Sequence, residues 1–248
     1  MLLGVVKKSV VTTMSNVSEF IKYQKLNIRA NIETSARCTL RCPQCTRIKL
    51  YSPKNTSDYK ETKQRIDNGF DLTINDAEKL LKFFDAGLML CGSISDPVHW
   101  PNLIDFLKLT NNYPNKSIQI HTAATQKSLS WYKHAFSLCH KNIVWRFGLD
   151  GLSDTSAVYR VGQNSQLLFD AMVLGKSMGL TIEWQYIIFK HNQHQIEKAK
   201  EFAQKHNINL FFVKSNRSGG GVEVPDDFKP KRNKETIDAC KETLNDSI

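Results

Sequence analysis

Three cysteines lie close together near the start of the chain, at Cys38, Cys42 and Cys45, with the spacing C-x3-C-x2-C. Thiolates are soft ligands, and three of them on one short loop can hold iron or zinc. A structural zinc site and a four-iron cluster each take four ligands. The nearest further candidates, Cys91 and His99, both come after a predicted helix. We therefore interpret the loop as a metal site with one coordination position open for a small molecule. On the motif alone, a zinc loop or a redox pair remains an alternative.

Length and composition favour one core and no membrane span. The 248 residues suit a single α/β domain, and 41% of them are apolar, with no run of eighteen. The N-terminus is a poor signal peptide, and six cysteines, three of them clustered, do not resemble a secreted disulfide framework. We therefore expect a cytoplasmic protein. A net charge of +10 favours acidic partners, although no nucleic-acid-binding motif accompanies it.

The hydrophobic pattern predicts strands that alternate with helices. Residues 26–33 alternate apolar and polar side chains, which is typical of a strand with one buried face, and the cysteine loop follows directly. Residues 1–25 are expected to form a leader helix, centred on residues 15–21, and residues 51–70 a polar loop. Further strands are predicted at 88–91, 117–121, 142–150, 181–188 and 208–213, with helices between them that begin near Thr73, Pro101, Ser128, Ser165 and Asn192. Right-handed crossovers between such units give a parallel sheet.

The cysteine loop resembles the signature of the radical S-adenosylmethionine (radical SAM) enzymes. The resemblance implies that Cys38, Cys42 and Cys45 bind three irons of a [4Fe-4S] cluster and are thereby catalytic. It also implies that S-adenosylmethionine binds the fourth iron and yields a 5′-deoxyadenosyl radical, which abstracts hydrogen from the substrate. The fold it implies is α/β, an open partial (βα)6 barrel of parallel strands over residues 26–215. An irregular tail over residues 216–248 would follow the barrel.

The resemblance also suggests residues that hold S-adenosylmethionine after the second and third strands. Asp96 and Pro97 match a Gly-Gly-Glu-Pro-like element of the family, in which the carboxylate binds the ammonium of the cofactor. Asp96 would otherwise only cap the turn before Pro97. Thr122 stands where many relatives have Thr-Asn-Gly. Ser95, and the alanines at 123 and 124, depart from the family pattern.

Further cofactor contacts are expected after the fourth and fifth strands. Asp150 resembles the aspartate of a Ser-x-Asp-Gly element, in which Gly148 replaces the serine. Arg160 resembles an arginine that pairs with the cofactor carboxylate, a role suited to a guanidinium, although a surface arginine is the plainer alternative. Gln185 and Asn192 would flank the ribose and adenine by position alone.

The sequence therefore predicts a radical SAM enzyme of the branch that includes peptide maturases and molybdenum-cofactor enzymes. A peptide or small metabolite would be the substrate, and a low-potential donor such as flavodoxin or ferredoxin would supply electrons. Two alternatives remain: a degenerate, non-catalytic iron-sulfur or S-adenosylmethionine-binding protein, and a nucleic-acid-modifying radical SAM enzyme.

The C-terminal tail contains one cysteine, Cys240, at about the place where related peptide maturases begin a set of ligands for auxiliary clusters. One cysteine cannot hold a second cluster. Cys91 and Cys139 fall in a predicted strand and helix, where a free thiol packs as a small hydrophobe. We therefore expect a single cluster and, from Ser218 onward, a poorly packed tail.

Overall fold

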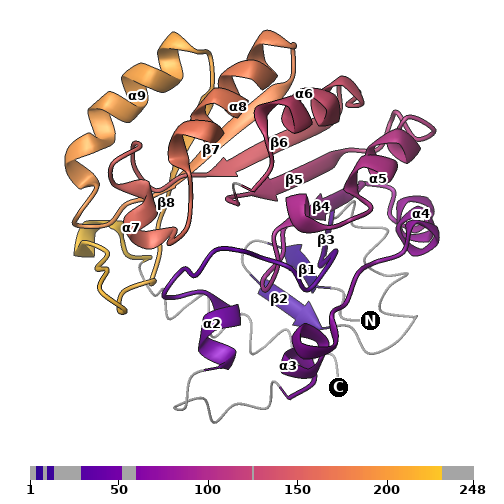
Figure 1. The fold of residues 1–248 in the computed structure, drawn as a ribbon, viewed down its shortest axis with the longest axis horizontal. Helices are drawn as coiled ribbons and strands as arrows, with labels where there is room; N and C mark the ends of the chain where they lie inside the picture. The colour runs from indigo at the N-terminus through magenta and orange to yellow at the C-terminus, as the bar shows by residue number, and fades with distance from the viewer. Residues whose placement is uncertain (1–3, 8–9, 14–28, 52–59, 125, 231–248) are drawn as a thin grey trace.

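The computed structural model describes residues 4–7, 10–13, 29–51, 60–124 and 126–230. At its centre is one sheet of eight strands in the order β2-β1-β3-β4-β5-β6-β7-β8 (Figure 1). Strands β3 to β8 are all parallel and follow one another in sequence order, which confirms the predicted α/β fold with an open, six-unit parallel sheet. These strands span Ala30–Ile32, Leu88–Leu90, Ile118–Thr122, Ile143–Gly148, Thr181–Ile187 and Asn209–Val213.

Five helices link the parallel strands and lie along one face of the sheet (Figure 1). Two of them begin at the predicted caps: the hydroxyls of Thr73 and Ser128 accept hydrogen bonds from the backbone N–H of Asp76 and of Trp131. The five helices are α4 (Ile74–Phe83), α5 (Leu103–Thr110), α6 (Leu129–Ser137), α8 (Ser165–Ser177) and α9 (Ile196–Lys205). Shorter helices α2 (Thr46–Leu50), α3 (Lys60–Asn68) and α7 (Ser156–Tyr159) lie outside this layer.

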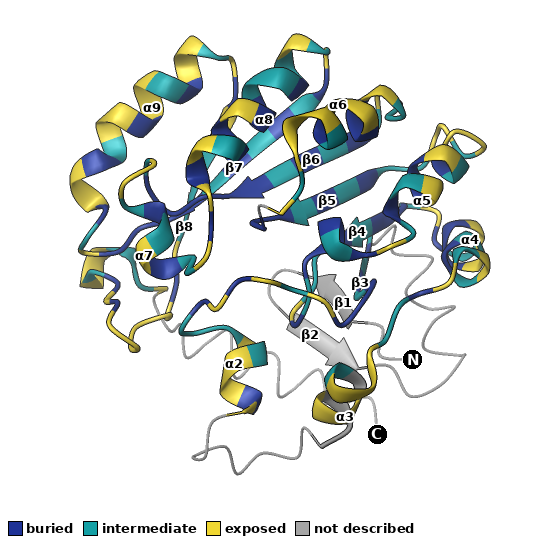
Figure 2. Cartoon of the chain, viewed as in Figure 1, coloured by how far each residue is buried: buried dark blue, intermediate teal, exposed yellow. Residues whose placement is uncertain are grey.

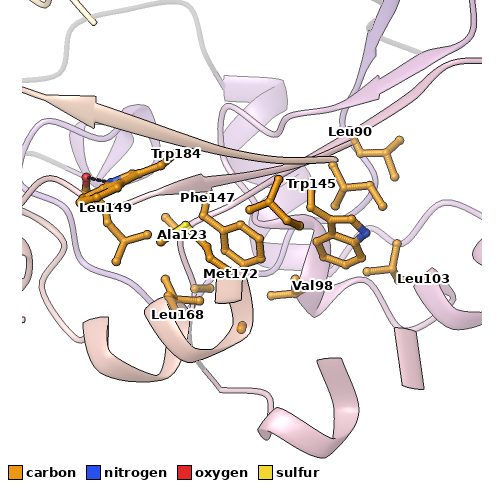
Figure 3. Close-up of a cluster of buried hydrophobic side chains, with 14 of the residues drawn as sticks. Leu90, Val98, Leu103, Ala123, Trp145, Phe147, Leu149, Leu168, Met172 and Trp184 are labelled. Atoms are coloured by element: carbon orange, nitrogen blue, oxygen red, sulfur yellow. Dashed lines mark hydrogen bonds between the residues drawn. The ribbon is translucent and has the colours of Figure 1, made fainter. Parts of the chain in front are cut away.

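The hydrophobic core lies between the sheet and the linking helices. Alternate strand residues are buried there, and the exposed residues of α6, α8 and α9 face outward (Figure 2). Trp145, Phe147 and Trp184 fill the centre of this layer, and the indole N–H of Trp184 donates to the carbonyl of Leu149 at 2.9 Å (Figure 3). The intervening strand residues, which are more polar, face the opposite side of the sheet. This polar inner face is available for chemistry.

Two segments differ from their sequence-based predictions. Strands β1 (Gly4–Lys7) and β2 (Val10–Thr13) form an antiparallel hairpin, and β1 pairs with β3, so the leader helix predicted for residues 1–25 is wrong over the described part. Its predicted centre, residues 15–21, lies outside the described residues. Helix α3 replaces much of the polar loop predicted over residues 51–70. Helical periodicity gave no sign of α3 because Ile66 is the single apolar residue of this helical segment.

The described part of the C-terminal tail packs against the barrel, contrary to our prediction. Val222 and Val224 are buried, and the backbone of Lys190 donates to the carbonyl of Glu223 at 2.8 Å. Gly220 adopts a positive φ of 64° and lies so close to Pro43 that a side chain at 220 would collide with the cysteine loop. Cys240 lies outside the described residues, so the prediction of a single cluster stays a prediction.

Replacing Val224 by alanine should therefore destabilise the protein. Val224 is fully buried, and its truncation removes apolar contacts between tail and barrel, at a cost of about 1–3 kcal/mol. Val158→Ala is the matched control, because Val158 is 47% exposed and should change stability by less than about 0.5 kcal/mol. Urea unfolding measures both variants. Equal stability of Val224→Ala and wild type would show that the tail does not support the barrel.

Candidate functional site

The cysteine loop follows β3 and runs along the carboxyl ends of the parallel strands. Cys42 is buried, whereas Cys38 and Cys45 are partly exposed. The backbone N–H of Cys45 donates to the carbonyl of Cys42 at 3.0 Å, which closes the second half of the loop into a turn. Helix α2 begins immediately after Cys45, and the Sγ of Cys45 lies 3.9 Å from the carbonyl of Ser93 in the loop after β4. The three thiols are thus held on one short segment at the edge where parallel α/β folds carry their sites.

Contacts with two other loops fix the position of this loop. The guanidinium of Arg47 donates to the carbonyl of Ala36 at 2.5 Å and to that of Ile94 at 3.1 Å. The backbone N–H of Arg41 donates to the carbonyl of Val161 at 3.0 Å. These bonds join the cysteine loop to the loop after β4 and to the loop after α7, so the thiols sit in a preformed frame.

Burial and mutual repulsion disfavour the charged form of the buried thiols. Burial raises the pKa of the Cys38 thiol to about 12, and the negative charges of Asp96 and of the other two cysteines contribute. Burial also raises the pKa of Cys42, while the neighbouring guanidinium of Arg160 lowers it. Metal binding requires thiolates, so metal binding to this loop must release protons. No three Cys, His, Asp or Glu side chains in the described ranges converge on a position for a single metal ion.

The carboxylate of Asp96 is buried and fully used by the protein. Its Oδ1 accepts from the hydroxyl of Thr122 at 2.7 Å and from the backbone N–H of Val98 at 3.2 Å. Its Oδ2 accepts from the backbone N–H groups of Ala123 and Ala124 at 2.7 and 3.0 Å. A carboxylate offers about four acceptor positions, and these four bonds join the turn at Asp96 to the end of β5. These side chains hold the loops, and their predicted contacts with S-adenosylmethionine stay predictions.

Asp150 and Arg160 form a second buried pair. The Nε of Arg160 donates to Oδ2 of Asp150 at 2.7 Å, and the side chain of Asp150 is 0% exposed against 12% for Arg160. The Oδ1 of Asp150 accepts from the backbone N–H of Ile187 at 2.7 Å. The predicted contact of Asp150 with the cofactor stays a prediction. Arg160 still lies beside Cys42, and Gly148 leaves room for its guanidinium.

The remaining predicted cofactor residues are Asn192, Pro97 and Gln185, and they differ in how far they are buried. Asn192 is fully buried: its amide donates to the carbonyls of Asp150 and Ile187, and its oxygen accepts from the N–H of Phe189. Its predicted position beside the ribose and adenine stays a prediction. Pro97 is buried in the first turn of the 3-10 helix Pro97–His99. Gln185 lies on the inner face of β7 and is partly exposed, so its prediction stands untested.

Glu33 holds the loop after β4, a role that sequence reasoning did not identify. One carboxylate oxygen accepts from the backbone N–H groups of Ser93 and Ile94 at 2.8 and 3.2 Å, and the other accepts from the hydroxyl of Ser95. Burial raises the pKa of Glu33, and these hydrogen bonds oppose that rise. A Cβ at Gly92 would collide with this carboxylate, so Glu33 and Gly92 together shape the loop beside Cys45. In the sequence, the only indication of this role is the position of an acidic residue between the first strand and the cysteine loop.

Comparison with solved structures identifies the fold. SuiB from Streptococcus suis, bound to S-adenosylmethionine, matches with a TM-score of 0.55 and 15% identity over 93% of this chain and 51% of its own. The anSMEcpe protein with bound AdoMet matches with a TM-score of 0.55 and 13% identity over 80% of this chain and 55% of its own. Both proteins are radical SAM enzymes.

This chain has the radical SAM fold. It spans about half the length of the solved structures it matches. No protein-family model and no curated protein matches the sequence. Within the described residues, no helix is both long and apolar enough to span a membrane.

Asp96→Asn should destabilise the chain by about 2–3 kcal/mol. The amide has one oxygen in place of two, so buried donors from the loops after β4 and β5 lose their acceptor. Asp105→Asn, on the exposed surface of α5, is the control and should stay within about 0.5 kcal/mol of wild type. Urea unfolding compares the two, and wild-type stability of Asp96→Asn would contradict the four-bond arrangement.

Proposed function

We propose that this chain is a radical SAM enzyme, in which Cys38, Cys42 and Cys45 bind a [4Fe-4S] cluster. The observation that carries the proposal is the position of three thiols on one loop, directly after the first parallel strand of this fold. Cysteine thiolates are the usual ligands of such clusters. The three thiols therefore fit in type and number if S-adenosylmethionine completes the coordination of the fourth iron. When bound, cluster and cofactor supply one-electron cleavage of the sulfonium and hydrogen abstraction from the substrate.

The protein's own part is to position these groups and to shield them. Arg47 and the backbone of Arg41 hold the cysteine loop, and Glu33 holds the adjacent loop against it. The positive charge of Arg160 beside Cys42 stabilises the thiolate form that a cluster requires. Gln185 is the remaining predicted contact on the inner face, where it would lie against the cofactor. Such positioning and exclusion of water is what a protein contributes around a reactive cofactor.

The departures from the family pattern support a working site over a degenerate one. The hydroxyl of Ser95 donates a hydrogen bond to the carboxylate of Glu33, so the serine has a specific structural contact. Ala123 and Ala124 supply backbone N–H groups to Asp96, which any non-proline residue can do. Gly148 admits the guanidinium of Arg160. Each substitution is therefore accommodated by a specific contact.

A peptide is the substrate class that the comparisons favour. SuiB bound to the precursor peptide SuiA matches with a TM-score of 0.54, and so does anSMEcpe with the Cp18Cys peptide, with 0.53. A small metabolite is the alternative. We expect a flavodoxin- or ferredoxin-like electron donor and a cytoplasmic location.

Anaerobic reconstitution tests the proposal. The wild-type chain should bind about four irons and, with a low-potential reductant, convert S-adenosylmethionine to 5′-deoxyadenosine and methionine. Cys42→Ala should abolish both iron binding and S-adenosylmethionine cleavage, because each thiolate holds a different iron. Cys139→Ala, in the loop after α6, is the control and should preserve both. A colourless protein with one zinc would overturn the proposal. An intact, reducible cluster that never yields 5′-deoxyadenosine would favour the degenerate alternative.

Arg160→Lys should weaken binding of S-adenosylmethionine about tenfold while the cluster stays intact. Lysine keeps a positive charge for Asp150 but loses the planar fork that can bind the cofactor carboxylate. Equilibrium binding to the reconstituted protein measures the change, with iron content as the control. Unchanged affinity would show that Arg160 serves only Asp150 and Cys42.

A further inference from the structure

Large apolar side chains are exposed on the surface beside the cysteine loop. In the part of the chain that the structure describes, four such side chains are exposed, and three of them, Ile48, Tyr51 and Val158, belong to segments next to this loop. Ile48 and Tyr51 are three residues apart on α2 and at its end, so they lie on one side of the helix, whereas Leu50 is buried. Val158 lies on α7, and the loop after α7 is hydrogen-bonded to the cysteine loop. A group of exposed apolar side chains with a polar rim marks an interaction surface.

Helix α2 is held in place, so this surface is preformed. The hydroxyl of Tyr51 donates to Oδ1 of Asp67 on α3 at 2.5 Å, and the Nζ of Lys63 lies 5.3 Å from the centre of the Tyr51 ring. On the other side, the guanidinium of Arg47 binds two backbone carbonyls. The helix begins directly after Cys45 and lies away from the five linking helices (Figure 1). The surface therefore adjoins the third thiol of the candidate site.

The segment that contains the cysteine loop, α2 and α3 is strongly basic. Residues 37–71 contain eight basic and four acidic residues, so these 35 of the 248 residues carry +4 of the net charge of +10. Arg41 and Lys49 are both exposed, and neither forms an ion pair with another described residue. Their charges are therefore available to a partner.

The C-terminal tail adds positive charge to the border of this surface. Gly220 lies against Pro43 of the cysteine loop, so residues 214–222 run beside that loop. This part of the tail contains Lys214 and Arg217, both exposed, and no acidic residue.

Carboxylates on the adjoining segments do not cancel this charge. Glu33 and Asp96 are engaged by backbone N–H groups of the loops after β4 and β5. Asp150 is buried and paired with Arg160. Asp154, just before α7, is the one exposed carboxylate in residues 148–162. The surface around α2 thus keeps an excess of positive charge.

The combination of apolar and basic side chains indicates the class of partner. Apolar residues at the centre and charges at the rim fit a protein with an acidic surface, because the charges steer and orient the partner while the apolar centre is buried. A nucleic acid would bind the charges but would leave Ile48 without an apolar contact. The position beside Cys45 points to electron delivery, since a cluster held by this loop must be reduced before it can act on S-adenosylmethionine.

We propose that Ile48, Lys49 and Tyr51, with Arg41 and Val158 beside them, form the docking surface for an acidic protein that donates one electron at a time. This inference rests on the proposed function, because it assigns the surface to the partner that reduces the cluster. In that step one electron leaves the donor's reduced flavin or iron-sulfur centre and enters the cluster, and no bond forms or breaks.

Two measurements on the reconstituted chain test this surface, with flavodoxin and a ferredoxin as acidic probes. Titration with the oxidised probe gives a Kd without electron transfer, and stopped-flow absorbance gives the rate at which the reduced probe bleaches the cluster. The wild-type Kd should rise steeply with salt, because exposed charges are screened beyond about 10 Å at 0.1 M ionic strength.

Ile48→Asp and Lys49→Glu should each weaken binding of the probe about tenfold and slow its reduction of the cluster. The matched controls lie on α6. Leu129→Asp is one, because Leu129 and Ile48 are both 38% exposed, and Lys133→Glu is the other. Both controls should bind the probe like wild type. With dithionite, a small reductant that needs no docking, all four variants should form 5′-deoxyadenosine at the wild-type rate.

Four outcomes would overturn the proposal. They are wild-type binding by Ile48→Asp and Lys49→Glu, an equal loss of binding in the α6 controls, slow turnover of the α2 variants with dithionite as well, and tighter binding of transfer RNA or of a poly-glutamate peptide than of either probe. The last result would assign the surface to a nucleic acid or an acidic peptide.

This proposal and the proposed function fail in different ways. A chain that forms a cluster and cleaves S-adenosylmethionine with dithionite, but binds neither flavodoxin nor ferredoxin, refutes the docking surface alone. A chain that binds a probe through α2 but forms no cluster refutes the proposed function alone. Iron content, measured on the same samples, separates the two results.

Discussion

The buried carboxylate of Asp96 is the contact on which the arrangement of the candidate site depends. Its side chain binds donors from the loops after β4 and β5, and its backbone N–H donates to the carbonyl of Arg37 at 2.8 Å, next to the first cysteine. One residue thus joins three segments that are distant in sequence. In a buried, low-dielectric setting such charge-assisted bonds are strong, and an unmet donor is costly. The cysteine loop is therefore positioned by a fixed polar network.

The network continues around the edge of the sheet through other buried polar side chains. Gln163 donates to the carbonyls of Ala123 and Gly148 at 2.7 and 3.0 Å, which joins the loop after β5 to the end of β6. Asp150 and Asn192 then join β6 to β7. These residues resemble ligand-binding positions in a sequence because they are polar and follow strands. Their physical role is to satisfy backbone groups where the strands end.

The sequence predicted the architecture because local patterns determine it. Apolar/polar alternation located the first parallel strand, short apolar segments located the other five, and the caps at Thr73 and Ser128 located two helix starts. The helix α3 could not be predicted because a segment with a single apolar residue, Ile66, shows no apolar periodicity. The hairpin of β1 and β2 depends on pairing with β3, which is a tertiary contact. Position after a strand was a sound guide to the edge of the sheet.

The same limit explains why the sequence alone did not reveal the role of Glu33 or the ion pair between Arg146 and Glu183. Arg146 and Glu183 are 37 residues apart, and only the register between β6 and β7 makes them neighbours. The structure separates two kinds of polar residue that look alike in sequence. The side chains of Asp96, Asp150 and Asn192 are hydrogen-bonded within the protein, and these bonds maintain the shape of the loops at the strand ends. Within the part of the chain that the structure describes, Arg29 and His121 each keep a buried nitrogen atom that makes no hydrogen bond, and an unmet polar atom of this kind costs free energy.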